Sequence, residues 1–148
     1  MRVYLDNCCY NRPFDDQSQV RIALESQAKL YVQRLISEGR LDLVVSYISR
    51  FENAANPYIT RKSAIDAFFR KAEFYVDYSY VESVEKNARD IMRSGVKEKD
   101  ALHIACAIEG TCRYFITTDR RVLKYFSPQI KICDPIDFLR ELEGITDA

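Results

Sequence analysis

Two acidic residues directly follow apolar runs that we expect to form strands. Asp6 comes after residues 2–5, and Asp119 comes after residues 114–118. Each acid also has a purely structural explanation, because an aspartate at such a place can close a turn or cap the next helix. Taken alone, neither position predicts a function.

Two more acids belong to helices that we expect close to these strands. Asp100 lies in the first turn of an apolar helix at 97–109, where it could also complement the helix dipole. Glu52 lies in the helix that follows a strand at 41–46. If all the carboxylates meet at one rim, they repel one another unless a cation lies between them. Oxygen ligands of this kind suit Mg²⁺ or Mn²⁺ rather than zinc.

Such ions support the hydrolysis of phosphodiesters. Two of them, about 3.5–4 Å apart, activate a water and stabilise the leaving oxygen. Because Mg²⁺ keeps several of its waters, few protein ligands are needed. The acids are therefore candidate metal ligands and candidate catalytic residues of a hydrolase: Asp6, Glu52, Asp100 and Asp119.

Expected strands and helices alternate along the chain and would position these acids. The strands are expected at 2–5, 41–46, 74–79, 114–118 and 131–133. The helices are expected at 18–38, 47–56, 59–72, 81–93, 97–109, 120–126 and 136–142, and a polar stretch at 7–17. Because helices must cover both faces of such a sheet, the pattern predicts a mostly parallel, three-layer α/β domain. Ligands of such sheets bind beyond the carboxyl ends of the strands.

The first long helix carries an apolar stripe at steps of three and four residues and is expected to end at Gly39. The stripe consists of Val20, Leu24, Ala28, Tyr31 and Leu35.

The composition is that of one globular domain over residues 1–148. The 22 basic residues balance the 22 acidic ones, which argues against a protein held to nucleic acid by bulk charge. No apolar run approaches the roughly 20 residues that span a bilayer. The N-terminus meets an acid before a signal-peptide core could form, so we expect a cytoplasmic protein.

Four sequence blocks resemble the PIN domain family of metal-dependent ribonucleases, which includes the VapC-type toxins. The blocks are Val3-Tyr4-Leu5-Asp6-Asn7, Ser49-Arg50-Phe51-Glu52, Lys99-Asp100-Ala101-Leu102-His103-Ile104-Ala105 and Phe115-Ile116-Thr117-Thr118-Asp119-Arg120. The resemblance covers essentially the full chain. It implies a three-layer α/β/α fold around a parallel five-stranded sheet, with the first and fourth strands side by side at its centre. Asp6 and Asp119 would then be neighbours.

The resemblance also implies an activity and partners. The protein would hydrolyse RNA phosphodiesters with a metal-activated water and Mg²⁺ or Mn²⁺ as cofactor. It could form a homodimer and be the toxin of a toxin–antitoxin pair, neutralised by a small antitoxin protein. The alternative is a catalytically inactive PIN-like scaffold that binds RNA or protein. A receiver-type domain is disfavoured, because its early acid pair, Asp15 and Asp16 here, lies well beyond the first strand.

Polar residues beside the acids are candidates for a supporting role. By resemblance, Asn7 and Thr118 would help position the water on the metal, although a turn and a capping hydroxyl explain them equally well. His103 lies three residues after Asp100, so both side chains project from nearly the same helix face. The histidine could orient Asp100 or act in acid–base chemistry, whereas a lone histidine on an apolar helix is more often a core residue.

Two segments leave alternatives open. If the helix that carries Glu52 were one turn out of register, Asn53 or Asn56 could replace that ligand. The loop after the first strand contains Asp15 and Asp16, which could supply a further acid.

The cysteines predict neither disulfides nor zinc. Five cysteines are an odd number, and cytosolic thiols stay reduced. Cys8, Cys9, His103 and Cys106 match the spacing of no zinc module.

A group of basic residues follows the last of the four acids. Arg120, Arg121 and Lys124 lie on one short expected helix, and Arg12 lies in the loop after the first strand. They could contact an RNA backbone, or they could form an ordinary solvated helix face. If four acidic residues surround metal ions, the rest of the chain carries an excess of four basic charges.

Overall fold

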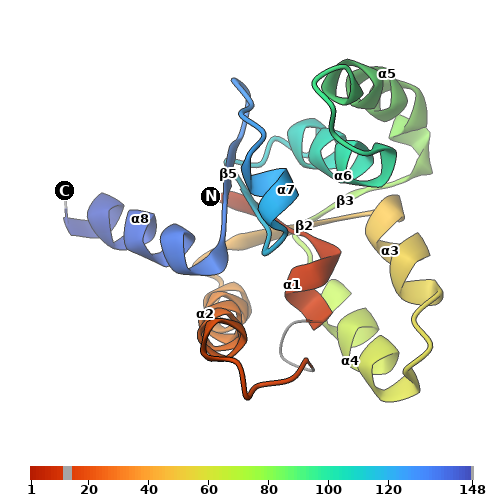
Figure 1. Cartoon of the computed structure of the whole chain (residues 1–148). Coiled ribbons are helices and arrows are strands. Elements are labelled where there is room, and N and C mark those ends of the chain that lie inside the picture. Colours follow the sequence, from red (N-terminus) through yellow and green to blue (C-terminus); the bar gives the residue numbers. More distant parts are fainter. Residues whose placement is uncertain (12–14, 148) are drawn as a thin grey trace.

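A five-stranded parallel sheet forms the centre of the computed structural model, which describes residues 1–11 and 15–147 (Figure 1). The strands lie side by side in the order β3-β2-β1-β4-β5. They are β1 (Arg2–Leu5), β2 (Asp42–Ser46), β3 (Phe74–Val76), β4 (Tyr114–Ile116) and β5 (Lys131–Cys133). The central position of β1 beside β4 confirms the arrangement that the resemblance implied, and Leu5 pairs with Ile116 at their carboxyl ends.

Helices cover both faces of the sheet (Figure 1). One face packs against α1 (Asn7–Asn11), α2 (Val20–Ser37), α4 (Ile59–Phe69) and α8 (Pro135–Asp147). The other face packs chiefly against α5 (Val81–Met92) and α6 (Glu98–Glu109). The helix α3 (Tyr47–Ala54) follows β2, and the short α7 (Arg120–Leu123) follows β4. The three-layer α/β/α architecture is therefore confirmed.

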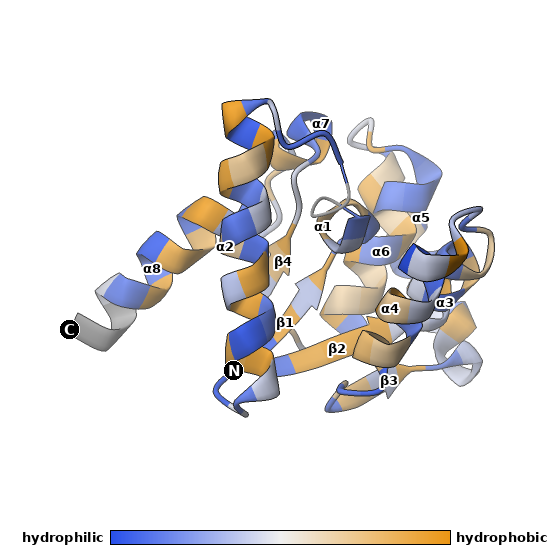
Figure 2. Ribbon diagram, turned by 90° about the horizontal axis from the view of Figure 1, so that it is seen from below, coloured by the Kyte–Doolittle hydropathy of each residue, from blue (hydrophilic) through white to orange (hydrophobic). Residues whose placement is uncertain are grey.

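Alternation along the strands separates two hydrophobic clusters. Val3 and Leu5 point into the cluster under α2 and α8, whereas Tyr4 between them points into the cluster under α5 and α6. Both faces of a parallel sheet are buried, so the central strands are mostly hydrophobic beyond their first residues, Arg2 and Asp42 (Figure 2). In the described range 1–11 and 15–147, no helix is long and apolar enough to cross a membrane.

Several expected segments differ in extent from the structure. The strand expected at 74–79 ends at Val76 and is followed by a short 3-10 helix at Tyr78–Tyr80, because the side chain of Asp77 caps that turn. The strand expected at 114–118 ends at Ile116, and the helix expected at 136–142 extends from Pro135 to Asp147.

The polar stretch expected at 7–17 begins with the helix α1, because Cys9 N donates to Asp6 O and the side chains of Cys9 and Tyr10 are buried. Arg12 lies outside the described residues. The helix expected at 120–126 ends at Leu123.

The prediction of which face of the first long helix is buried is also wrong. Val20, Leu24 and Tyr31 are exposed, and only Ala28 and Leu35 of that stripe are buried. Two charged residues, Glu25 and Lys29, also lie on the buried face, so apolar periodicity alone does not identify that face. The end of the helix was predicted correctly, since Gly39 takes a positive φ of 74° directly beyond it.

The position of α6 on the sheet depends on close backbone approach at Gly110. A Cβ atom at this residue would lie 2.7 Å from Val44 Cγ1 and 3.4 Å from Val76 Cγ2. Both valines are buried in their strands and have little room to move. The absence of a side chain at Gly110 therefore fixes how closely α6, with Asp100 in its first turn, lies against β2.

We expect Gly110→Ala to lower the free energy of unfolding by about 1–3 kcal/mol, because the new methyl group overpacks the contact with Val44. Urea denaturation followed by circular dichroism measures the change. The matched control is Gly144→Ala, at a helical glycine with open space around it, which should raise stability by up to about 1 kcal/mol. Equal effects of the two substitutions would contradict the close approach.

Candidate functional site

Asp6 is held where β1 and β4 end side by side. Its backbone N donates to Ile116 O (2.9 Å), which continues the sheet by one residue. The residue is only 6% exposed, and its side chain accepts hydrogen bonds from Thr117 Oγ1 to Oδ2 (2.8 Å), from Asn7 N to Oδ1 (2.8 Å) and from Cys8 Sγ to Oδ2 (3.6 Å). The carboxylate is therefore fixed at the carboxyl edge of the sheet, as expected.

Thr117 links the first acid to the last. Its hydroxyl donates to Asp6 and accepts a hydrogen bond from Asp119 N (3.1 Å). Asp119 caps α7 by accepting from Arg121 N (2.9 Å), and Arg121 Nε lies 3.8 Å from the same carboxylate oxygen. The capping function that the sequence suggested for Asp119 is thus present, and it leaves the second oxygen of the carboxylate without an assigned donor among the described residues.

Asp100 is the candidate acid on which the charges of the other two aspartates act. Its pKa is raised, first by partial burial and then by the negative charges of Asp6 and Asp119. The positive charges of His103 and Arg121 act in the opposite direction. Asp6 and Asp119 therefore each act electrostatically on Asp100, although the three acids are far apart in the sequence.

Glu52 forms a separate pair with His103. Its side chain is 7% exposed, and Oε1 accepts a hydrogen bond from His103 Nε2 (2.8 Å) while Lys99 Nζ lies 3.8 Å away. Burial disfavours the protonated imidazole, but the hydrogen bond to Glu52 and the charges of Asp6, Glu52 and Asp100 outweigh it, so the pKa of His103 is raised. The resulting stabilisation is fully present below the ordinary histidine pKa of about 6.5 and is lost as the pH rises through the raised value.

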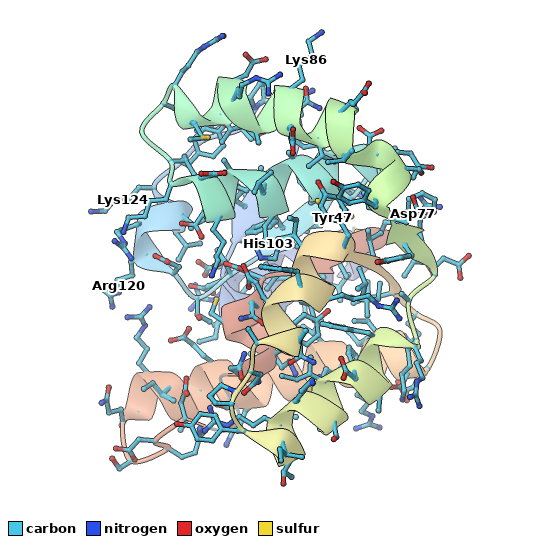
Figure 3. The ribbon with its side chains drawn as sticks, turned by 90° about the vertical axis from the view of Figure 1, so that its right-hand side faces the viewer. Tyr47, Asp77, Lys86, His103, Arg120 and Lys124 are labelled. Carbon is cyan, nitrogen blue, oxygen red and sulfur yellow. The ribbon has the colours of Figure 1, made fainter. Side chains whose placement is uncertain are left out.

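His103 connects the site to a buried polar chain in the core. Its Nδ1 lies 2.6 Å from the hydroxyl of Tyr4, which also lies 2.6 Å from Ser46 Oγ and 2.9 Å from Ser49 Oγ. Ser46 caps α3, the helix that carries Glu52. The chain therefore ties β1, α3 and α6 together. Figure 3 shows His103 inside the molecule, between α6 and α3.

The supporting residues proposed from the sequence take different positions from those expected. Thr118 is buried and its backbone N donates to Cys8 Sγ (3.3 Å), while the hydroxyl on Asp6 comes from Thr117. Asn7 contributes its backbone N to Asp6, and its side-chain oxygen faces Asn11 Nδ2 (3.5 Å). His103 contacts Glu52, and its influence on Asp100 is electrostatic.

The proposed substitutes for Glu52 have structural roles. Asn53 Nδ2 donates to Asp66 Oδ1 (2.7 Å) and to Lys62 O (3.1 Å), which holds α3 against α4. Asn56 Nδ2 faces Asn11 Oδ1 and Asn53 Oδ1, each at 3.4 Å. The expected register of α3 is thereby supported, with Glu52 on the side that meets His103.

Basic side chains lie beside the acids, on α7 and on α2. Arg120 and Arg121 are exposed on α7, and Lys124 follows its end; Figure 3 shows Arg120 and Lys124 on one side of the molecule. Sequence reasoning missed Arg21, which donates from Nη2 to Thr118 O (3.4 Å) and pairs through Nε with Glu25 Oε1 (2.9 Å). No spacing signal could have linked Arg21 to a residue 97 positions away.

The carboxylates of the candidate site are suitable ligands for a hard cation, but they do not form a preorganised metal site. Within residues 1–11 and 15–147, no group of three or more His, Cys, Asp or Glu side chains is placed to hold a metal ion, and this includes the cysteines considered for zinc. The acids offer carboxylate oxygens only, which Mg²⁺ and Mn²⁺ prefer, and Mg²⁺ needs few protein ligands. The raised pKa of Asp100 marks an excess of negative charge that a cation would relieve. By chemistry the residues fit such an ion.

Comparison with known proteins identifies a similar fold. The sequence matches no protein-family model and no curated protein. Among solved structures, the chain is similar to the crystal structure of VapBC2 from Rickettsia felis bound to a DNA fragment from their promoter, with a TM-score of 0.54. The match covers 89% of this chain and 97% of that chain at 14% sequence identity. The chain therefore has a PIN-like fold of the kind found in that complex.

Proposed function

We propose that the protein is a ribonuclease that hydrolyses RNA phosphodiesters with water and requires Mg²⁺ or Mn²⁺. The observation that carries the proposal is that Asp6 and Asp119, which follow the adjacent strands β1 and β4, both repel the negative charge of Asp100. The three acids come from segments that are far apart in the sequence. Asp6 and Asp119 follow adjacent strands, at the edge of the sheet where open α/β sheets bind ligands. A purely structural role does not require like charges to meet.

The side chains have distinct tasks in this proposal. Asp6, Asp100 and Asp119 would hold the cation, and Glu52 would contribute from the opposite side. When bound, such an ion lowers the pKa of water and stabilises the charge that develops on a phosphate. Thr117 and Asn7 hold the carboxylate of Asp6 in one orientation, and His103 does the same for Glu52. No serine or cysteine nucleophile is required, so the reaction would pass through no covalent intermediate.

The fold supports a toxin–antitoxin role. The similar structure is a VapBC2 complex, and the present chain covers almost all of the chain that it matches. We infer that this protein is the toxin of such a pair and that a small antitoxin protein binds over the acidic crevice. Homodimer formation belongs to the same proposal.

One observation favours the alternative of an inactive PIN-like scaffold that binds RNA or protein. Each of Asp6, Asp119 and Glu52 already accepts a hydrogen bond from the protein, and the described residues form no ready group of three ligands. A scaffold would show no acid-dependent binding of Mn²⁺. Titration with Mn²⁺ therefore distinguishes the two functions.

We expect the purified protein to cleave RNA in the presence of Mn²⁺ and to lose this activity on chelation. Asp6→Asn and Asp100→Asn should each lower kcat by more than about a hundredfold, since even groups that only orient a metal ligand cost 10–100-fold. Lys86→Ala, on the outer helix α5, should retain full activity (Figure 3). Activity that persists unchanged in both acid variants would belong to a contaminating nuclease and would contradict the proposal.

Asp100 should reduce stability in the absence of metal. Because its folded pKa is raised, its ionisation penalises the native state above that pKa, and the penalty vanishes as the pH falls below the unfolded value. We expect Asp100→Asn to raise Tm at pH 7 by about 1–3 °C and to leave it unchanged near pH 3. Scanning calorimetry of the metal-free protein measures this difference.

A bound metal ion should make the wild type more stable than Asp100→Asn, the reverse of the order expected without metal. Mn²⁺ should raise the Tm of the wild type and leave that of Asp100→Asn unchanged, because binding stabilises only a folded state with an intact site. Asp90→Asn, at an exposed residue of α5, is the control and should behave like the wild type in both experiments. A lower Tm for Asp100→Asn without metal would refute mutual repulsion.

The hydroxyl of Tyr4 should affect both stability and the site. Tyr4→Phe leaves His103, Ser46 and Ser49 without their shared partner, and we expect a loss of about 1–3 kcal/mol in unfolding free energy. Since His103 then holds Glu52 less firmly, Mn²⁺ affinity should fall about tenfold. Tyr78→Phe, at an exposed tyrosine, is the matched control. Unchanged Mn²⁺ affinity in Tyr4→Phe would remove Glu52 from the proposed site.

A further inference from the structure

A hollow of about 430 Å³ has one of the candidate site acids, Asp100, in its wall. Arg121, which lies 3.8 Å from Asp119, also lines it, so the hollow adjoins the candidate site. The turn between α5 and α6 provides one side, and the end of α7 with the segment beyond it provides the other. Three cationic and two aromatic residues line it together with Asp100: Lys97, Arg121, Lys124, Tyr125 and Phe126.

The aromatic side of the hollow contains a phenylalanine whose side chain is not packed in the core. Phe126 is 82% exposed, whereas Tyr125 beside it packs against the cluster under α6. The segment 124–126 also borders a second hollow of about 460 Å³, so it forms a ridge between two depressions. An exposed phenyl ring on a ridge among cations is a surface on which a nucleobase can stack.

The cationic side of the hollow has charge available for a ligand. Within the part of the chain that the structure describes, neither Lys97 nor Lys124 forms an ion pair. Arg121 lies 3.8 Å from Asp119 but is 69% exposed, so it also faces solvent. Three cations against one carboxylate make the hollow locally positive in a protein whose total charge is zero. Phosphates on a flexible strand match this charge.

We propose that this hollow binds one nucleotide of single-stranded RNA, next to the phosphate that is cleaved, an inference that rests on the proposed function. The base stacks on Phe126, and the adjoining phosphates contact Lys97 and Lys124. The shared wall at Asp100 places this nucleotide beside the acids. Duplex RNA is excluded, because its bases are already stacked and are not available to an aromatic side chain.

Binding of a labelled single-stranded RNA of about eight nucleotides, measured by fluorescence anisotropy in chelator, tests this proposal without cleavage. Phe126→Ala should raise Kd about 5- to 100-fold, and Phe126→Tyr, which keeps the stacking ring, should stay within about twofold of the wild type. Lys124→Ala should reduce the slope of log Kd against log salt by about 0.7. Lys86→Ala is the matched control: it replaces a lysine by alanine on α5, far from Lys124, and should change neither Kd nor the salt dependence (Figure 3).

Three results would overturn the proposal: no RNA binding by the wild type, equal Kd values for Phe126→Ala and the wild type, or binding of duplex RNA as tight as that of the single strand. Thermal unfolding checks the fold of each variant, and Lys124→Ala tests the site even if Phe126→Ala fails to fold.

Cleavage with Mn²⁺ separates the two proposals. If the wild type cleaves RNA, Phe126→Ala should raise KM with little change in kcat, and an unchanged KM would refute the hollow while leaving the ribonuclease intact. If the wild type binds RNA through Phe126 but never cleaves it, the ribonuclease is refuted and the nucleotide site stands.

Discussion

The repulsion of Asp100 by Asp6 and Asp119, the acids at the carboxyl ends of β1 and β4, is the constraint on which the surrounding structure depends. Parallel strands in adjacent positions end at the same edge, so residues that follow them are forced together. The protein offsets the repulsion with local donors. Thr117 and Asn7 N bind Asp6, and Arg121 lies beside Asp119. These contacts fix the orientation of two acids but leave Asp100 with a raised pKa.

A series of buried hydrogen bonds, from Glu52 through His103 and Tyr4 to Ser46, holds the elements of the site in fixed relative positions. Polar groups in a core are costly unless each has a partner, so a completed chain selects one relative position of the elements that contribute to it. Tyr4 contacts residues from α3 and α6 at once, and its ring stacks on Phe115 of β4 (5.4 Å between ring centres). The helices that carry Glu52 and Asp100 are therefore aligned through a side chain of β1.

The order of the strands and helices was largely predictable from the sequence, because it follows from local patterns. Runs of β-branched residues marked the strands, and Gly39 marked the end of α2. The parts that were wrong depend on tertiary packing. Glu25 and Lys29 lie on the buried face of α2, where charged residues are not expected, so periodicity selected the neighbouring face.

The acids of the site were predictable for the same reason, whereas their partners were not. An acid that directly follows a strand lies at the carboxyl end of that strand, and Asp6 and Asp119 both hydrogen-bond to Thr117 there. Which of two adjacent threonines reaches Asp6 depends on tertiary structure: Thr117 N continues the pairing with Cys133 O beyond the end of β4, and its hydroxyl donates to the acid. Likewise, His103 could have faced Asp100 on its own helix, and only the position of α3 directs it to Glu52.

Arg121 links the acids of the candidate site electrostatically to the adjacent hollow. Its backbone N and its guanidinium both lie near Asp119, its charge lowers the pKa of Asp100, and its side chain lines the adjacent hollow. A ligand phosphate in the hollow would compete for this guanidinium, and the acids would then lose part of their compensation. A cation between the acids would restore it. Binding of an anionic strand in the hollow and binding of a cation in the crevice should therefore favour each other, because each relieves the charge imbalance that the other creates.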